Sequence, residues 1–180
     1  VKEIHLTDTH SKLLVFSTFG KVYALRAFDI PEASLKARGK PIINLLPLNK
    51  AENIATFLPL PNDEVSWKNK FIVFATKSGF SKKNNLIDVA LSGKRDLRDT
   101  GKRCIKLETN DSLIGVIIAN NSDDILLSSS EGKCLRTSVN NISLKKGLTT
   151  GANKTIVLEK NNFLVSTSKL KHSPINMKIR

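Results

Sequence analysis

Compact apolar runs recur along the chain, and each is followed by a short polar turn that ends in glycine. The runs are LLVF, FIVFA and DILL, at residues 13–16, 71–75 and 124–127, and the turns close at Gly20, Gly79 and Gly132. A turn of the form Ser/Thr-x-x-Gly between extended segments predicts a β-hairpin whose glycine has a positive φ. After the first glycine, KVYALRAF alternates imperfectly between apolar and polar residues, which is typical of a half-buried strand.

A second glycine follows the first in every segment at a nearly constant distance. It lies 19, 22 and 19 residues further on, at Gly39, Gly101 and Gly151. Behind it come another apolar stretch (PIINLLPL, KRCIKLE and ANKTIVLE), a short polar turn and a last apolar strand. The same order of parts, three times over, predicts a repeat of about fifty-five residues with four strands in each unit.

Units of this kind predict an all-β fold in which four-stranded blades stack around an axis, as in a propeller. Within residues 1–170 we expect about three blades, at roughly residues 11–60, 71–120 and 124–169. Long amphipathic helices are hard to find in the sequence. Residues 171–180, KHSPINMKIR, form a basic tail outside the pattern.

The charge balance narrows the choice of partner. The chain has 180 residues, with 29 Lys and Arg against 16 Asp and Glu, a formal net charge of +13 and a pI near 9.9. Such a surplus favours a polyanionic partner, nucleic acid first and an anionic membrane surface second. The longest apolar runs are too short to cross a bilayer and the N-terminal residues lack a signal segment, so we expect a cytoplasmic protein.

Residues that could carry catalysis or bind a metal are few and scattered. Cys104 and Cys134 lie in apolar segments without a CxxC pair or a Cys/His cluster, so we expect both to be small core residues. Tyr23 lies in the middle of a strand pattern, which indicates packing. The three histidines have no metal-ligand spacing, and the sequence contains no P-loop. We therefore expect no catalytic site, metal or cofactor on this chain.

Three stretches resemble one known family. LLVFSTFGKVYALRAFDIPEASLKARGKPIINLLPL, KRCIKLETNDSLIGV and DDILLSSSEGKCLR resemble, in this order, the C-terminal domain of DNA gyrase A. The resemblance implies a β-pinwheel, a propeller-like disc of four-stranded blades with duplex DNA wrapped around its basic rim. It also implies a non-catalytic role in negative supercoiling by an ATP-dependent type II topoisomerase. The partners would then be the rest of the gyrase A polypeptide and the gyrase B polypeptide.

The sequence departs from the family pattern in two respects. The family's glycine-rich basic box, Gln-(Arg/Lys)-Arg-Gly-Gly-(Arg/Lys)-Gly, is not found, and three units stand where the family has about six. We therefore expect a fragment of a longer polypeptide. Two alternatives stay open: the corresponding C-terminal domain of topoisomerase IV, which would bind DNA without a full wrap, and a propeller-type module that binds an acidic protein.

Basic residues gather in the recurring loops and predict the DNA contacts. One set flanks the second glycine of each unit, and another follows the hairpin glycines. In a radial array these loops form a discontinuous positive track that neutralises phosphates with little reading of bases. The third long loop lacks the basic pair of the first, so we expect the track to fade towards the end of the chain. The predicted DNA-binding residues are Lys21, Arg26, Lys36, Arg38, Lys40, Lys82, Lys83, Lys94, Arg95, Arg98, Lys102, Arg103, Lys133, Arg136, Lys145 and Lys146.

Overall fold

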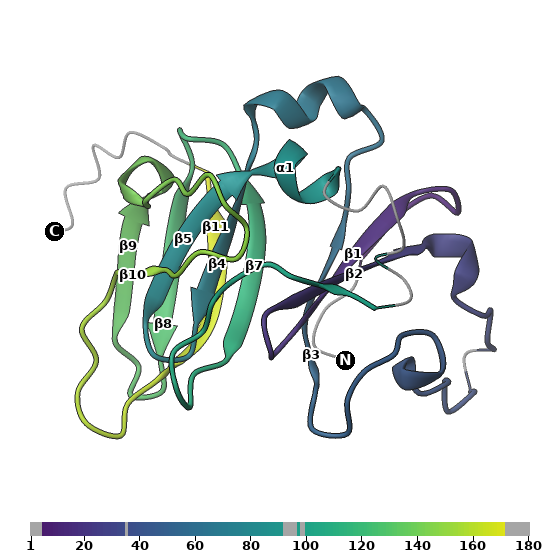
Figure 1. The fold of residues 1–180 in the computed structure, drawn as a ribbon, viewed down its shortest axis with the longest axis horizontal. Coiled ribbons are helices and arrows are strands. Elements are labelled where there is room, and N and C mark those ends of the chain that lie inside the picture. Colours follow the sequence, from purple (N-terminus) through teal and green to yellow (C-terminus); the bar gives the residue numbers. More distant parts are fainter. Residues whose placement is uncertain (1–4, 35, 92–96, 98–99, 172–180) are drawn as a thin grey trace, which may run out of the picture.

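The computed structural model describes residues 5–34, 36–91, 97 and 100–171. Within them the chain forms three antiparallel sheets, named blades 1, 2 and 3, and only short helices (Figure 1). The predicted all-β array of about three blades is confirmed. The helices are α1 (Leu86–Ala90) and the 3-10 turns η1 (Ala27–Asp29), η2 (Ile42–Asn44), η3 (Glu64–Asn69) and η4 (Val139–Asn141).

Each blade is built on a hairpin and a third strand that pairs with the hairpin's first strand. The hairpins are β1 (Lys12–Ser17) with β2 (Lys21–Arg26), β4 (Phe71–Thr76) with β5 (Phe80–Asn85), and β8 (Asp124–Ser129) with β9 (Cys134–Ser138). The third strands are β3 (Ile54–Pro59), β7 (Leu113–Ala119) and β11 (Leu164–Leu170). The predicted positive φ of the turn glycines is confirmed, at 72°, 86° and 81° for Gly20, Gly79 and Gly132.

The fourth strand of a blade comes from the following repeat, which the sequence pattern did not predict. β6 (Lys102–Arg103), from the second repeat, pairs with β2 and completes blade 1. β10 (Asn153–Lys154), from the third repeat, pairs with β5 and completes blade 2. The prediction that each unit supplies its own four strands is therefore wrong. In the first repeat, PIINLLPL forms η2 and buries Leu46 against blade 1 instead.

The blades pack against one another through their third strands. β7 lies against β3 of blade 1 and against β11 of blade 3, so these strands form the inner part of the array. Because β6 and β10 lie at the opposite side of their sheets, they form the outer edge of the array. Between blades 1 and 2 the rings of Phe16 and Phe74 meet edge to face, 5.8 Å apart, and Trp67 is buried in the same apolar cluster.

The two cysteines differ in their surroundings. Cys104 is buried, as predicted, and burial raises the pKa of its thiol to about 12. Cys134 lies on β9 and is exposed, so the prediction that it is a core residue is wrong. The physical reason is that β9 is the edge strand of the described part of blade 3. Among the helices of the described residues, none is both long and apolar enough to span a membrane.

Candidate nucleic-acid interface

The outer edge of blade 1 carries three of the predicted basic residues side by side. β6 pairs with β2 so that Lys21 lies opposite Arg103, with Lys102 next to it along the strand. Lys102 and Arg103 are exposed, whereas Lys21 is half-buried with its Nζ 3.9 Å from Glu52 Oε2. Like charges on neighbouring strands repel each other, so a polyanion bound along this edge would relieve the repulsion.

Three more predicted residues lie in the long loop that follows η1. Lys36, Arg38 and Lys40 are exposed, and none of them has a hydrogen bond or ion pair with another residue that the structure describes. Gly39 lies between the last two with a φ of 72°, which glycine adopts without the strain that a side chain adds. The loop therefore presents three cations that the fold itself does not use.

The structure removes Lys82 and Lys83 from the predicted interface. Both side chains are buried on β5, because segments of the third repeat cover this strand. The Lys82 ammonium donates a hydrogen bond to the Leu148 carbonyl oxygen at 2.5 Å. The Lys83 ammonium donates to Val139 O and to Asn121 Oδ1, both at 2.8 Å. Burial lowers the pKa of Lys82 to about 8 and also lowers the pKa of Lys83. These lysines join repeats and do not face solvent.

On blade 3 carboxylates engage the predicted basic residues. Arg136 binds Asp124 Oδ2 through Nη2 at 2.7 Å and through Nε at 2.8 Å. Lys133 forms an ion pair with Glu159, and the hydrogen bond between them raises the pKa of Lys133 and lowers that of Glu159. Carboxylates therefore compensate the positive charge of both Lys133 and Arg136 on blade 3.

The loop before β10 contains two further predicted residues. Lys145 is held on blade 2, since its backbone N–H donates to Lys83 O at 2.8 Å and its Nζ donates to Asn153 Oδ1 at 3.1 Å. Lys146 is exposed. The remaining predicted residues lie outside the described part of the chain; they are Lys94, Arg95 and Arg98.

Lys154 is a basic residue of the outer edge that the sequence pattern missed. It lies on β10 opposite Phe80, in the register position that Arg103 takes opposite Lys21 in blade 1. Its Nζ donates to Ser78 O at 2.7 Å and lies 4.8 Å from the centroid of the Phe80 ring. The third repeat thus places a basic residue at this edge, although its long loop lacks the basic pair of the first. The distance from the second glycine is one residue longer than in the second repeat, which hid the match.

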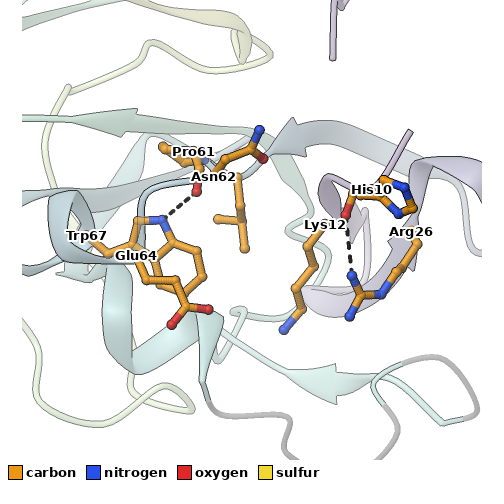
Figure 2. A pocket seen from close by; sticks show the side chains of 8 residues that line it. His10, Lys12, Arg26, Pro61, Asn62, Glu64 and Trp67 are labelled. Atoms are coloured by element: carbon orange, nitrogen blue, oxygen red, sulfur yellow. Dashed lines mark hydrogen bonds between the residues drawn. The ribbon is translucent and has the colours of Figure 1, made fainter. Parts of the chain in front are cut away.

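Arg26 lies at the far end of β2 from β6, beside a pocket of about 190 Å³ (Figure 2). It faces Lys12 across the hairpin, and its guanidinium donates to His10 O at 3.3 Å. The indole of Trp67 lines the pocket and donates to Pro61 O at 2.8 Å. Burial lowers the pKa of Lys12, and the nearby Arg26 charge lowers it further. Arg26 thus belongs to a separate cationic hollow, away from the cluster at β6.

Tyr23 is fully buried and belongs to the core of blade 1, which confirms its predicted packing role. Its hydroxyl donates to Glu52 Oε1 at 3.1 Å. Burial, together with this hydrogen bond, raises the pKa of Tyr23 to about 12. Burial also acts to raise the pKa of Glu52, but hydrogen bonds from Ser17, Asn49 and Tyr23 outweigh it and the pKa is lowered.

Comparison with known proteins identifies the repeat. The family model described as DNA gyrase C-terminal domain, beta-propeller, matches residues 11–61, 70–120 and 123–168. The chain belongs to the DNA gyrase C-terminal domain family. Each matched range contains one hairpin and all or most of its third strand, and the described fourth strands, β6 and β10, are each taken from the next range.

Sequence relatives are DNA gyrase A proteins. The gyrase A of Granulibacter bethesdensis is 36% identical over 166 residues, which cover 91% of this chain and 17% of that protein. The gyrase A of Aeromonas salmonicida is 43% identical over 136 residues, or 76% of this chain and 14% of that protein. The chain thus spans less than a fifth of the length of these relatives.

Solved structures share the fold. The C-terminal domain of DNA topoisomerase IV matches with a TM-score of 0.76 at 21% identity, covering 91% of this chain and 48% of that one. The DNA gyrase A C-terminal domain matches with a TM-score of 0.70 at 20% identity, covering 91% and 49%. At these identities the likeness establishes the fold, a pinwheel of blades, and does not establish the function.

Proposed function

We propose that this gyrase C-terminal domain chain binds the backbone of duplex DNA along the outer edge of its blades and wraps it, without a catalytic site of its own. The observation that carries the proposal is the group of cations on and beside blade 1. They comprise Lys21, Lys102 and Arg103 at the β2–β6 edge and Lys36, Arg38 and Lys40 in the loop. Such side chains neutralise phosphates and release counterions, with little selection among base sequences.

In the whole enzyme the wrap supports ATP-dependent negative supercoiling. DNA curved around the disc presents a neighbouring segment for strand passage by the rest of gyrase A, together with gyrase B, in the bacterial cytoplasm. Smooth bending of 20–30 base pairs by 40–90° costs on the order of 1–6 kcal/mol, so several weak contacts must act together. The spread of cations over an edge and a loop supports such a set of weak contacts.

The salt dependence of DNA affinity tests the binding. With a labelled duplex, we expect the affinity to fall by about 10³ between 50 and 200 mM salt if six or more phosphates are contacted. The double variant Arg38→Ala/Lys40→Ala should weaken binding equally on unrelated sequences and reduce the salt slope by about one per lost contact. The control Lys68→Ala/Lys169→Ala removes the same charge from exposed positions on η3 and β11. A flat salt response, or an equal loss in the control, would contradict the proposal.

Retained writhe tests the wrap separately. Nicked circular DNA is ligated with the chain bound, and the linking number is read after the protein is removed. We expect a shift that Lys102→Ala/Arg103→Ala abolishes. Binding without a shift in linking number would be consistent with the DNA contacts and would contradict the wrap.

A second candidate is the corresponding domain of topoisomerase IV. The solved C-terminal domain of topoisomerase IV shares this fold with a TM-score of 0.76 at 21% identity, so the fold alone does not separate the two functions. Because such a domain directs DNA without a full wrap, it predicts steep salt dependence and a small linking shift. A module that binds an acidic protein would instead leave duplex DNA unbound at low salt.

A further inference from the structure

A hollow of about 190 Å³ lies between the hairpin of blade 1 and η3, the 3-10 turn that leads to blade 2 (Figure 2). At about 30 Å³ for each water molecule, this volume corresponds to about six waters. It suits a small ion or a single phosphate group, because pockets that bury a larger organic ligand have volumes of about 300–1,000 Å³. All of its lining residues lie between His10 and Trp67, on or beside β1, β2, β3 and η3.

Two cations face the hollow from opposite positions of the blade 1 hairpin. Lys12 on β1 pairs with Arg26 on β2. Figure 2 shows the Lys12 ammonium between the Arg26 guanidinium and the Glu64 carboxylate. Burial and the Arg26 charge lower the pKa of Lys12, whereas Glu64 acts to raise it. Like charges at opposite positions of an antiparallel pair destabilise it, so an anion in the hollow would relieve a repulsion within the hairpin.

The other blades show that the fold does not require this pair of cations. The equivalent first pair of the hairpin ladder is Phe71 with Asn85 in blade 2. In blade 3 it is Asp124 with Ser138. Two opposed cations at this position are therefore a feature of blade 1, and they indicate a ligand instead of a structural need of the repeat.

Both cations retain donors for a ligand. Among the described residues, the Lys12 ammonium donates to Ala90 O at 3.0 Å, at the end of α1. The Arg26 guanidinium donates to His10 O at 3.3 Å. These bonds fix the direction of each side chain. Because an ammonium has three N–H donors and a guanidinium has five, further N–H groups are left on both.

The neutral oxygens of the wall are engaged elsewhere. Pro61 O accepts the indole N–H of Trp67 at 2.8 Å. The side-chain oxygen of Asn62 accepts from Ser11 Oγ at 2.9 Å. Glu64 is exposed and supplies the one carboxylate among the described residues that line the hollow. Its charge is therefore the part of the wall that repels an anion.

We propose that this hollow binds a phosphate group through Lys12 and Arg26, and that Glu64 weakens the binding. The tetrahedral oxygens of a phosphate can accept hydrogen bonds from an ammonium and a guanidinium at the same time, and both groups are common phosphate ligands. The phosphate belongs either to the backbone of duplex DNA or to a small phosphorylated ligand. The site is separate from the DNA contacts proposed above, because the cations of the β2–β6 edge and of the loop after η1 do not line the hollow.

The fluorescence of Trp67 gives the first test, because it is the single tryptophan of the chain and lines the hollow. Inorganic phosphate is titrated into the full chain at constant ionic strength, with acetate as the comparison anion. We expect a saturable change with phosphate, and a Kd that is about tenfold higher or more in Lys12→Met/Arg26→Gln. An equal response to acetate, or no saturable response to phosphate, would overturn the proposal.

The matched control removes two charges from exposed positions that do not line the hollow. Lys68→Met/Lys169→Gln changes one residue on η3, next to the fluorescent indole, and one on β11. The control should bind phosphate as wild type does. An equal loss of affinity in the control would show a general effect of charge and would overturn the site.

Glu64→Gln gives a second test that does not depend on how the double variant folds, since a loss of folding cannot tighten binding. Removing the carboxylate should lower the Kd for inorganic phosphate about two- to fivefold, the effect of one exposed charge pair. Glu108→Gln removes an exposed carboxylate outside the hollow and should leave the Kd unchanged. A Kd that is unchanged or higher in Glu64→Gln would contradict the assignment.

A labelled duplex separates the two sources of the phosphate. If it belongs to the DNA backbone, Lys12→Met/Arg26→Gln should weaken duplex binding more than the control Lys68→Met/Lys169→Gln does. If it belongs to a small ligand, the variant should bind the duplex as the control does and lose only the response to inorganic phosphate. Either result supports the site. Arg38→Ala/Lys40→Ala should keep the phosphate response, so a failure of the proposed DNA wrap is distinguishable from a failure of the hollow.

Discussion

Replacing Lys82 by methionine tests how a buried ammonium is held between two repeats. The side chain is fully buried, and its pKa falls from 10.5 to about 8, chiefly because of burial. Between these two pH values the unfolded chain keeps a proton that the folded chain has lost. The free energy of unfolding therefore rises with pH across this window, and below pH 8 the folded protein carries the full penalty.

The magnitude follows from the two pKa values and one hydrogen bond. The difference between 10.5 and about 8, at 1.36 kcal/mol per pKa unit, corresponds to a penalty of about 3 kcal/mol. Removing the donor to Leu148 O costs about 1–3 kcal/mol, because that carbonyl loses its partner. At pH 7 we expect Lys82→Met to be as stable as wild type or more stable by up to about 2 kcal/mol. Above pH 10.5 the penalty is gone, and the variant should be less stable by about 1–3 kcal/mol.

Urea unfolding at a series of pH values between 7 and 10.5 measures the effect. The free energy of unfolding of the variant is subtracted from that of wild type, so the titrations of groups that do not interact with Lys82 cancel. We expect the free energy of unfolding of wild type, relative to that of the variant, to rise by about 3 kcal/mol between pH 7 and pH 10.5. Lys77→Met is the matched control, since Lys77 is exposed with its Nζ 4.6 Å from the Phe163 ring centroid. A difference for Lys82→Met that is as flat as that of the control would refute the reasoning.

Two further changes probe the blades by urea unfolding. In Gly79→Ala the new side chain has to adopt a φ of 86°, and its Cβ would lie only 2.8 Å from Ile156 O. In Gly132→Ala the φ is similar, 81°, and no described atom would lie within 4 Å of the new Cβ. We expect Gly132→Ala to lower the free energy of unfolding by about 1–2 kcal/mol and Gly79→Ala to lower it clearly more. Equal losses would contradict the close packing of Ile156 over Gly79. Tyr23→Phe removes the hydrogen bond to Glu52 and should cost about 1–3 kcal/mol at pH 7. Because folding lowers the pKa of Glu52, the ionised carboxylate stabilises the fold above 4.5, and this contribution disappears as the pH falls through the lowered pKa. The loss in Tyr23→Phe should therefore shrink at acid pH, and a loss that is constant with pH would count against an ionised partner.

Local chemistry made the hairpins predictable. A run such as LLVF followed by Ser/Thr-x-x-Gly specifies two strands and a turn whose glycine takes a positive φ, whatever surrounds it. Repetition of this unit was enough to predict stacked blades. The basic loop at Arg38 and Lys40 was predictable for the same reason, since its exposure depends on nothing distant.

Burial of the two lysines on β5 was not predictable from the local sequence. SKKNN, within residues 80–85, carries the polar residues of an exposed strand, yet Ser81, Lys82, Lys83 and Asn84 are all buried. The cause is a segment some sixty residues further along the chain, which lays Leu148 O against Lys82 and Ser143 O against the backbone of Lys83. Side-chain alternation tells which face a residue takes and leaves open what will cover it.

The sequence by itself therefore determined the repeat, the hairpins, the glycine turns and the surplus of positive charge. Only the tertiary structure decided which blade each fourth strand joins, and with it where the cations lie. Lys102 and Arg103 come from the second repeat but meet Lys21 on blade 1, and Lys154 comes from the third repeat but lies on blade 2. The physical reason is that backbone pairing is the same for any extended segment. The choice of partner is made by the space over a hairpin glycine and by the side chains that fill it.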